Sequence, residues 1–163
     1  MATTSLTAAL GARALHTRWL VRAPIQLYRA GLGFLFGSRM LMLQHIGRKS
    51  GETRYVVLEV VDRPAPGEYV IVSGFGTRAQ WYRNIRTNPQ VRISTGTTRN
   101  RPGIATPMTG EESATALAHY VRDHPAAWKK LRATIEHATG KPVDTLPMVR
   151  LRMAAAPGDG RIG

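Results

Sequence analysis

The stretch MLMLQHIGRKSGETRYVVLEVVD, residues 40–62, is the part of the sequence that decides the fold. Met40 to Ile46 is a short apolar run that stops at Gly47, and Tyr55 to Asp62 is rich in β-branched residues. Side chains of these types favour the extended backbone of a strand. The two runs therefore predict two strands, joined by a loop that begins and ends with glycine.

Similar patterns predict further elements on the C-terminal side of this pair. A Pro-Ala-Pro-Gly turn at 64–67 separates the second strand from the third. The remaining strands are predicted at 69–73, 91–95, 104–108 and 148–153, with 96–103 as a connection. Helices are predicted at 79–87, 109–124 and about 126–138. Because the helices are grouped and do not alternate with strands, the pattern indicates an α+β fold.

The N-terminal segment, residues 1–38, has the pattern of a basic amphipathic helical region. Pro24 suits the first position of a helix, and Arg18, Arg22 and Arg29 share one helical face. Such a segment can lie on an anionic membrane surface or pack its apolar side against the domain. Both interpretations stay open from the sequence.

The charge distribution points to a negatively charged partner. The chain has 23 Lys and Arg against 10 Asp and Glu, a formal net charge of +13. Its first acidic residue is Glu52, and another acid-free stretch runs from Glu68 to Glu111. A field of one sign concentrates anions. Nucleic acid, an anionic membrane and a phosphorylated or carboxylated small molecule are the candidate partners.

Composition also excludes several kinds of chemistry. The chain has no cysteine, which excludes disulfides, thiolate nucleophiles and cysteine-bound metals. No apolar run approaches the roughly 20 residues that span a bilayer, and arginines interrupt any signal-peptide core. We therefore expect a cytoplasmic protein, with peripheral contact to an anionic inner membrane face as an open alternative.

Familiar catalytic signatures fail in this sequence. Arg48 occupies the position where a phosphate loop needs its second glycine, and Gly74-Phe75-Gly76 lacks the third glycine of the dinucleotide fingerprint. There is no Gly-x-Ser-x-Gly elbow, and the five histidines show no metal-ligand spacing. The sequence predicts neither a catalytic nucleophile nor a metal site.

Three short segments instead suggest a binding site. In the first, Arg48, Lys49, Ser50 and Arg54 supply three cations and a hydroxyl beside glycines whose N–H groups are accessible. The two arginines can bind phosphate through two N–H groups at once, whereas the lysine is a point charge. This segment predicts an anion cradle, although a solvated hairpin with ordinary surface charges would have the same composition.

The second and third segments suit a ring system. Ser73-Gly74-Phe75-Gly76 follows a strand, and its glycines let the backbone lie flat against a ring. Trp81, Tyr82 and Asn84 follow at the start of a helix and offer an aromatic wall and one polar contact. Each segment alone could equally be a turn or part of the core.

Together, from about Leu41 to Met108, these segments closely resemble the deazaflavin-dependent nitroreductase family of actinobacteria. The resemblance implies a split β-barrel of six or seven antiparallel strands with helices packed around it. It also implies coenzyme F420, a deazaflavin with a phosphodiester and an oligoglutamate tail. On this basis the chain divides into residues 1–38, a cofactor-binding barrel at 39–153 and a flexible tail at 154–163.

The resemblance also assigns roles to residues. Arg48, Lys49, Ser50 and Arg54 would hold the phosphate and tail, and Tyr55 and Val56 would lie along the strand beside the cofactor. Ser73, Gly74, Phe75 and Gly76 would line the ring, and Trp81, Tyr82 and Asn84 would complete the pocket. The expected function is hydride transfer between reduced F420 and a small organic acceptor, such as a nitro compound, quinone or enone.

Two alternatives remain beside this hypothesis. The same barrel could bind FMN in place of F420. The basic surface could belong to a non-catalytic protein that binds anions, nucleic acid or membrane, although no recognition helix or stacking platform for nucleic acid is evident. A homodimer is compatible with either function.

Overall fold

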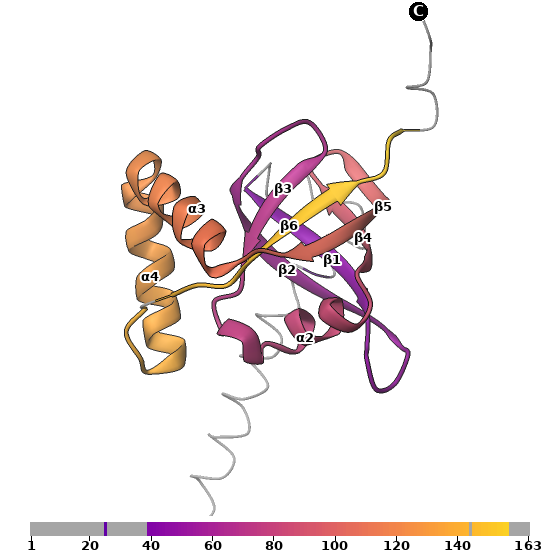
Figure 1. Cartoon of the computed structure of the whole chain (residues 1–163), viewed down its shortest axis with the longest axis horizontal. Helices are drawn as coiled ribbons and strands as arrows, with labels where there is room; N and C mark the ends of the chain where they lie inside the picture. The colour runs from indigo at the N-terminus through magenta and orange to yellow at the C-terminus, as the bar shows by residue number, and fades with distance from the viewer. Residues whose placement is uncertain (1–24, 26–38, 144, 157–163) are drawn as a thin grey trace, which may run out of the picture.

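Six antiparallel strands form a closed barrel in this computed structural model, which describes residue 25, residues 39–143 and residues 145–156 (Figure 1). The strands are β1 (Met40–Ile46), β2 (Thr53–Asp62), β3 (Glu68–Val72), β4 (Gln90–Thr95), β5 (Thr98–Pro107) and β6 (Met148–Met153). Their order around the barrel is β1-β2-β3-β6-β5-β4, and pairing between β1 and β4 closes it. The predicted α+β split barrel is confirmed, with six strands.

Over residues 39–156, as far as the structure describes them, three α-helices pack around the barrel. They are α2 (Gln80–Thr87), preceded by the short 3₁₀ turn η2 (Gly76–Arg78), α3 (Gly110–Asp123) and α4 (Pro125–Thr139). Figure 1 shows α3 and α4 side by side against one flank of the barrel, while α2 lies across one end. Local signals fix the helix ends: Thr109 and Glu112 form a reciprocal capping box, and Gly140 ends α4 in the left-handed conformation at φ 67°.

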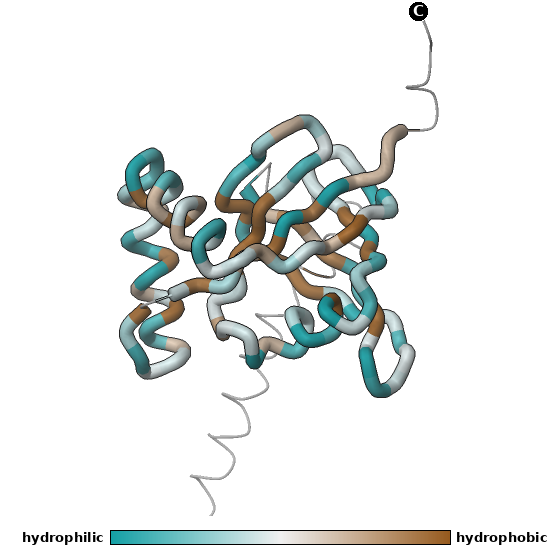
Figure 2. The backbone as a smooth tube through the Cα atoms, in the orientation of Figure 1, coloured by the Kyte–Doolittle hydropathy of each residue, from teal (hydrophilic) through white to brown (hydrophobic). Residues whose placement is uncertain are grey.

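The barrel interior holds the main core. Leu41, Leu43, Ile71, Ile93 and Leu151, from four different strands, are fully buried there. Figure 2 shows the apolar residues gathered along the strands and the polar ones at the loops. Burying one such side chain stabilises the fold by about 1.5–3 kcal/mol, so this cluster is a major source of stability.

A second core lies between the outer surface of the barrel and the pair of helices α3 and α4. Tyr69 and Ile71 of β3 face the interior, whereas Val70 and Val72 face the helices. Strand β3 is therefore buried on both sides, which explains its uninterrupted apolar sequence. The Tyr120 hydroxyl of α3 donates a 2.8 Å hydrogen bond to the Glu59 carboxylate of β2. Burial, together with this carboxylate, raises the pKa of Tyr120.

One predicted connection is wrong. The sequence suggested a long link over 96–103, but β5 begins at Thr98, and only Gly96 and Thr97 join it to β4. Gly96 has φ +54°, as tight hairpin turns require. None of the residues 98–101 is buried and all four are polar, so this part of β5 lacks the apolar alternation that marks a strand. The other predicted elements lie within two residues of their observed ends.

Two predictions fall largely outside the described residues. The N-terminal segment contributes only Ile25, and the tail contributes only residues 154–156, which are exposed. Among the residues the structure describes, no helix is both long enough and apolar enough to cross a bilayer.

Candidate functional site

A cavity of about 890 Å³ lies at the end of the barrel that α2 covers. The start of β2, the turn around η2 and the first turns of α2 contribute most of its lining. Its lining residues are Ile25, His45, Thr53, Arg54, Tyr55, Val56, Phe75, Arg78, Ala79, Gln80, Trp81 and Asn84. Six of the thirteen predicted site residues are among them, and they come from all three predicted segments. None of the lining residues is an Asp or Glu.

The loop between β1 and β2 is compact and holds its cations beside this cavity. Gly47 N–H donates to the Glu52 carbonyl at 2.8 Å, and Gly51 N–H donates to the Gly47 carbonyl at 2.8 Å. A Cβ atom on Gly47 would lie 2.7 Å from Ser50 Oγ and 3.0 Å from Arg54 Nε. Glycine at this position therefore lets the loop close and lets the Arg54 side chain lie across it.

Asn84 of α2 connects this helix to the β1–β2 loop through hydrogen bonds with Arg48. Its Oδ1 accepts hydrogen bonds from the Arg48 backbone N–H at 3.1 Å and from Arg48 Nη1 at 2.9 Å. Arg48 Nη1 also donates to Gln80 Oε1 at 2.9 Å. Asn84 is buried, with 3% of its surface exposed. Arg48 itself is not among the lining residues, but its guanidinium is bonded to Gln80 and Asn84, which are, and its Nε and Nη2 groups are still able to donate.

Asn84 also contacts the buried imidazole of His45 on β1. Its Nδ2 lies 3.2 Å from His45 Nδ1, and only 4% of His45 is exposed. Burial, and secondarily the charge of Arg54, lower the pKa of His45 to about 4. The imidazole is therefore neutral at physiological pH.

This lowered pKa predicts a loss of stability in mild acid. In the unfolded chain His45 takes up its proton near pH 6.5, whereas in the folded protein it does so only near pH 4. Between these values the unfolded state binds more protons, so the free energy of unfolding falls as the pH falls. We expect this group to remove on the order of 3 kcal/mol between pH 6.5 and 4.

Urea unfolding of wild type and His45→Asn across this pH range measures the effect. The wild-type curve should fall more steeply than that of the variant. His119→Asn removes an exposed histidine of α3 and should keep the wild-type slope. Parallel curves for wild type and His45→Asn would contradict the prediction.

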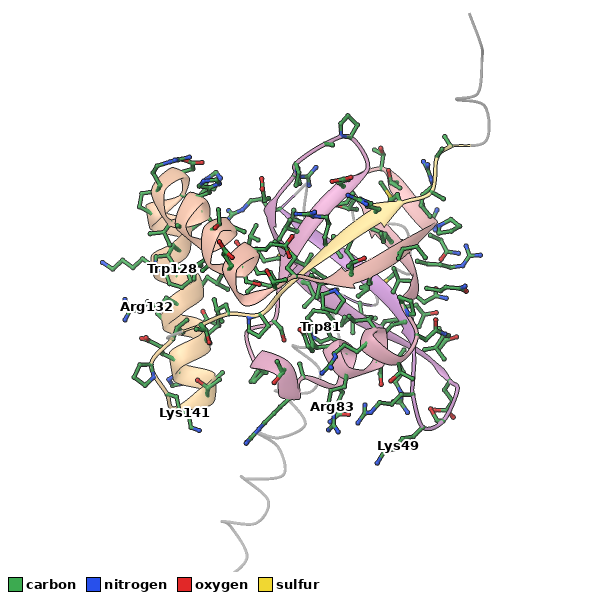
Figure 3. The ribbon with its side chains drawn as sticks, viewed as in Figure 1. Lys49, Trp81, Arg83, Trp128, Arg132 and Lys141 are labelled. Atoms are coloured by element: carbon green, nitrogen blue, oxygen red, sulfur yellow. The ribbon has the colours of Figure 1, made fainter. Side chains whose placement is uncertain are left out.

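The other predicted cations are more exposed. His45 and Arg54 are paired directly across β1 and β2, so their side chains project from the same face of the barrel wall. Arg54 Nη2 lies 3.2 Å from Glu52 Oε2, an ion pair open to solvent. Figure 3 shows Lys49 and Arg83 pointing away from the barrel, whereas Trp81 lies on the barrel side of α2. Lys49 and Ser50 are exposed at the loop tip and do not line the cavity.

Four other predicted residues lie outside the cavity lining. Ser73 is fully buried, and its hydroxyl donates to the Gly76 carbonyl at 2.7 Å. Gly74 packs against α4, because a Cβ there would lie 3.1 Å from Ile135 Cγ1. Gly76 adopts φ +66° in the turn, and Tyr82 lines a separate cavity against α3. These positions shape the turn and α2, and their roles as direct cofactor contacts stay predictions.

Sequence reasoning missed several lining residues, of which His45 and Gln80 are the most informative. His45 continues the inward alternation of Leu41 and Leu43, a signal that could have placed it on the inner face of β1. Gln80 lies four residues before Asn84 on α2, the spacing at which two side chains share a helix face. Arg78 lies in the acid-free stretch between Glu68 and Glu111, and no local pattern predicts it as a site residue.

The closed antiparallel barrel, with a cavity of cations and aromatics at one end, defines a cofactor-binding protein of the split β-barrel class. Residues 20–144 match the sequence profile of the F420H(2)-dependent quinone reductase family. The chain belongs to this family. It is an F420-dependent oxidoreductase, and its cofactor is coenzyme F420.

One curated relative agrees with this membership, and two solved structures are similar to the chain. The chain is 36% identical over 89 residues to Rv3178 of Mycobacterium tuberculosis, which carries the same quinone reductase description; the match covers 53% of this chain and 72% of the relative. The solved F420-H2 dependent reductase FDR-A is 25% identical, with a TM-score of 0.48, over 70% of this chain and 94% of that one. HutZ, a heme storage protein of Vibrio cholerae, shares the fold at 15% identity and a TM-score of 0.51, over 76% of this chain and 87% of its own.

Proposed function

We propose that F420 binds in the cavity beneath α2 and that the enzyme passes its hydride to a quinone. The observation that carries the first part is the convergence of three separate sequence segments on one cavity, whose described lining residues include no carboxylate. A polyanionic cofactor would be repelled by acidic side chains in such a confined place. Their absence from the lining, beside Arg48, Arg54 and Arg78, favours this location.

The residues present fit the chemistry of the cofactor. Arg54 and Arg78 line the cavity and can donate to phosphate oxygens, and the anchored Arg48 lies next to Gln80 and Asn84 on its wall. Trp81 and Phe75 supply flat apolar surface for a tricyclic ring. A volume of about 890 Å³ suits a ligand of this size. When bound in its reduced form, F420 supplies a hydride, and the protein supplies position and electrostatics.

The quinone assignment rests on the family and on the cavity rim. Relatives with this sequence pattern are described as quinone reductases. Phe75, at the mouth of the cavity, is 65% exposed, an unusual position for a large apolar side chain. Its ring offers apolar surface over which a flat acceptor can approach the cofactor.

The proposal is tested by titrating the protein with F420 and, separately, with FMN while following tryptophan fluorescence. Trp81 lines the cavity, so F420 should quench its emission, and Trp81→Phe should remove most of that signal. F420 should bind more tightly than FMN, because its oligoglutamate tail adds charged contacts. Equal affinity for the two ligands, or a preference for FMN, would contradict the proposed cofactor site.

Other predictions about the surroundings of the enzyme stay open. A homodimer remains compatible with the fold, and one solved relative, at 22% identity, is described as a domain-swapped dimer. A cytoplasmic location, with peripheral contact to an anionic membrane through residues 1–38, is also part of the proposal. Vesicle sedimentation with and without these residues, at low and high salt, would test that contact.

A further inference from the structure

The Asn84 amide has only one orientation that satisfies its neighbours. Two donors of Arg48, the backbone N–H and Nη1, both meet Oδ1 of Asn84. An NH₂ group in that place would face two donors, so the oxygen must face Arg48 and the nitrogen must face His45. Arg48 therefore fixes which end of the amide His45 meets.

The orientation of Asn84 in turn fixes the tautomer of His45. Asn84 Nδ2 donates, so His45 Nδ1, 3.2 Å away, must accept. A neutral imidazole that accepts at Nδ1 carries its proton on Nε2. His45 thus has one defined donor, the Nε2–H group, on the side of the ring away from Asn84.

This donor has no partner within the described part of the chain. Its only hydrogen bond there is the one with Asn84. Among those residues, Arg150 Nε is the only side-chain nitrogen or oxygen that is both out of solvent contact and without a partner. His45 Nε2 must therefore retain contact with open space, and His45 lines the cavity beneath α2. A nearly buried N–H group without a partner is ready to donate to a ligand.

The surrounding charges define the acceptor. Arg54 is paired with His45 across the two strands, and Arg48 lies on the far side of Asn84. Glu52, the acid bonded to Arg54, is not part of the cavity lining. The local field therefore favours an anionic oxygen at Nε2. His45 hydrogen-bonds Asn84 on the helix that also carries Trp81, and it stands two residues before the cationic loop, so this oxygen is assigned to the linker between ring and tail.

We propose that His45 is a binding residue and that its Nε2–H group donates to a phosphoryl oxygen of the bound cofactor, beside the guanidinium of Arg54. This role rests on the proposed F420 site and adds a contact that none of the sequence segments predicted. Both residues line the cavity. The exposed Arg54 supplies charge, whereas the nearly buried His45 supplies one directional, uncharged donor.

Variants of His45 combined with truncated ligands test this contact. In His45→Asn, the short amide can still accept from Asn84 but does not reach the cavity, whereas His45→Gln places an NH₂ group near the position of Nε2. The ligands are F420, its phosphodiester form without glutamates, and a deazaflavin without phosphate. His45→Asn should weaken binding of both phosphorylated ligands by about 10-fold and leave the third unchanged. His45→Gln should recover part of the loss.

A second measurement does not depend on any variant folding. In wild-type protein labelled with ¹⁵N-histidine, the free protein should show His45 protonated at Nε2. That nitrogen resonance should shift on adding either phosphorylated ligand but not on adding the unphosphorylated one. The same shift with all three ligands, or none with any, would overturn the proposal.

The outcomes also separate this proposal from the function on which it rests. If His45→Asn lost affinity equally for all three ligands, His45 would have only a structural role, and the proposed contact with the phosphoryl group would be overturned. The proposed F420 site would not be contradicted by that result. A loss confined to the glutamylated form would assign the acceptor to a tail carboxylate, again overturning the phosphoryl contact. Wild-type protein that binds none of the three would overturn the cofactor site and the role of His45 together.

Discussion

Replacing Asn84 with leucine is expected to lower the free energy of unfolding by about 3 kcal/mol and to weaken F420 binding at least 100-fold. Leucine has the same number of side-chain heavy atoms and the same branching as asparagine, but it leaves the Arg48 backbone N–H and His45 Nδ1 without their partner. Each unpaired, largely buried polar group costs about 1–3 kcal/mol. Arg48 also loses one of its two side-chain anchors, so the loop is no longer held at the cavity.

Urea unfolding gives the stability and fluorescence titration gives the affinity. Asn84→Asp is the matched control for stability, because a carboxylate still accepts from both Arg48 donors and can also accept from His45 when the imidazole carries its proton on Nδ1. This variant should lie within about 1 kcal/mol of wild type. It should nevertheless bind F420 poorly, because it places a negative charge in the cavity wall. Wild-type affinity in Asn84→Leu would mean that the loop is not part of the binding site.

Arg48→Ala is expected to lower the affinity for F420 by about 10- to 100-fold and to change the turnover rate at saturating cofactor much less. A charge-assisted hydrogen bond contributes about 1.5–3 kcal/mol, which corresponds to this range. The contact is made equally in the ground state and the transition state, since it lies away from the carbon that gives up the hydride. Its loss therefore affects binding rather than chemistry.

Lys49→Ala provides the comparison, because it removes a neighbouring cation that is exposed and points away from the barrel (Figure 3). Solvent and salt screen such a charge, so the affinity should fall less than in Arg48→Ala. The assay is steady-state oxidation of reduced F420 with the cofactor concentration varied. Equal effects of the two substitutions would mean that hydrogen bonding of Arg48 to α2 plays no part in cofactor binding.

Most elements of the fold could be predicted because their signals are local. The apolar run of β1, the β-branched residues of β2 and the Thr109 cap each act over a few neighbouring residues. The exception is the first half of β5, where polar residues that are not buried show no apolar alternation. Its strand conformation comes from pairing with β4, which pattern reasoning along the chain does not reveal.

In the candidate site, too, some residues are marked by local patterns in the sequence and others are recognised only from their contacts. Arg48, Arg54, Trp81 and Asn84 could be singled out because glycines, charges and aromatics are conspicuous in short segments. The alternation with Leu41 and Leu43 could have placed His45 on the inner face of β1, but no local pattern indicated a role in the site. Its importance depends on Asn84, 39 positions away, and on Arg54 across the sheet.

The sequence by itself determined the elements, the excess of positive charge and the three segments that carry the family resemblance. These properties depend on residue types and short spacings. Only the tertiary structure decided that six strands close, that Ser73, Gly74 and Tyr82 lie outside the cavity lining, and that Arg48, Asn84 and His45 form one hydrogen-bonded chain. Which way a side chain points depends on strand register and on how a helix is rotated against its neighbours. Both are set by contacts between residues far apart in the chain.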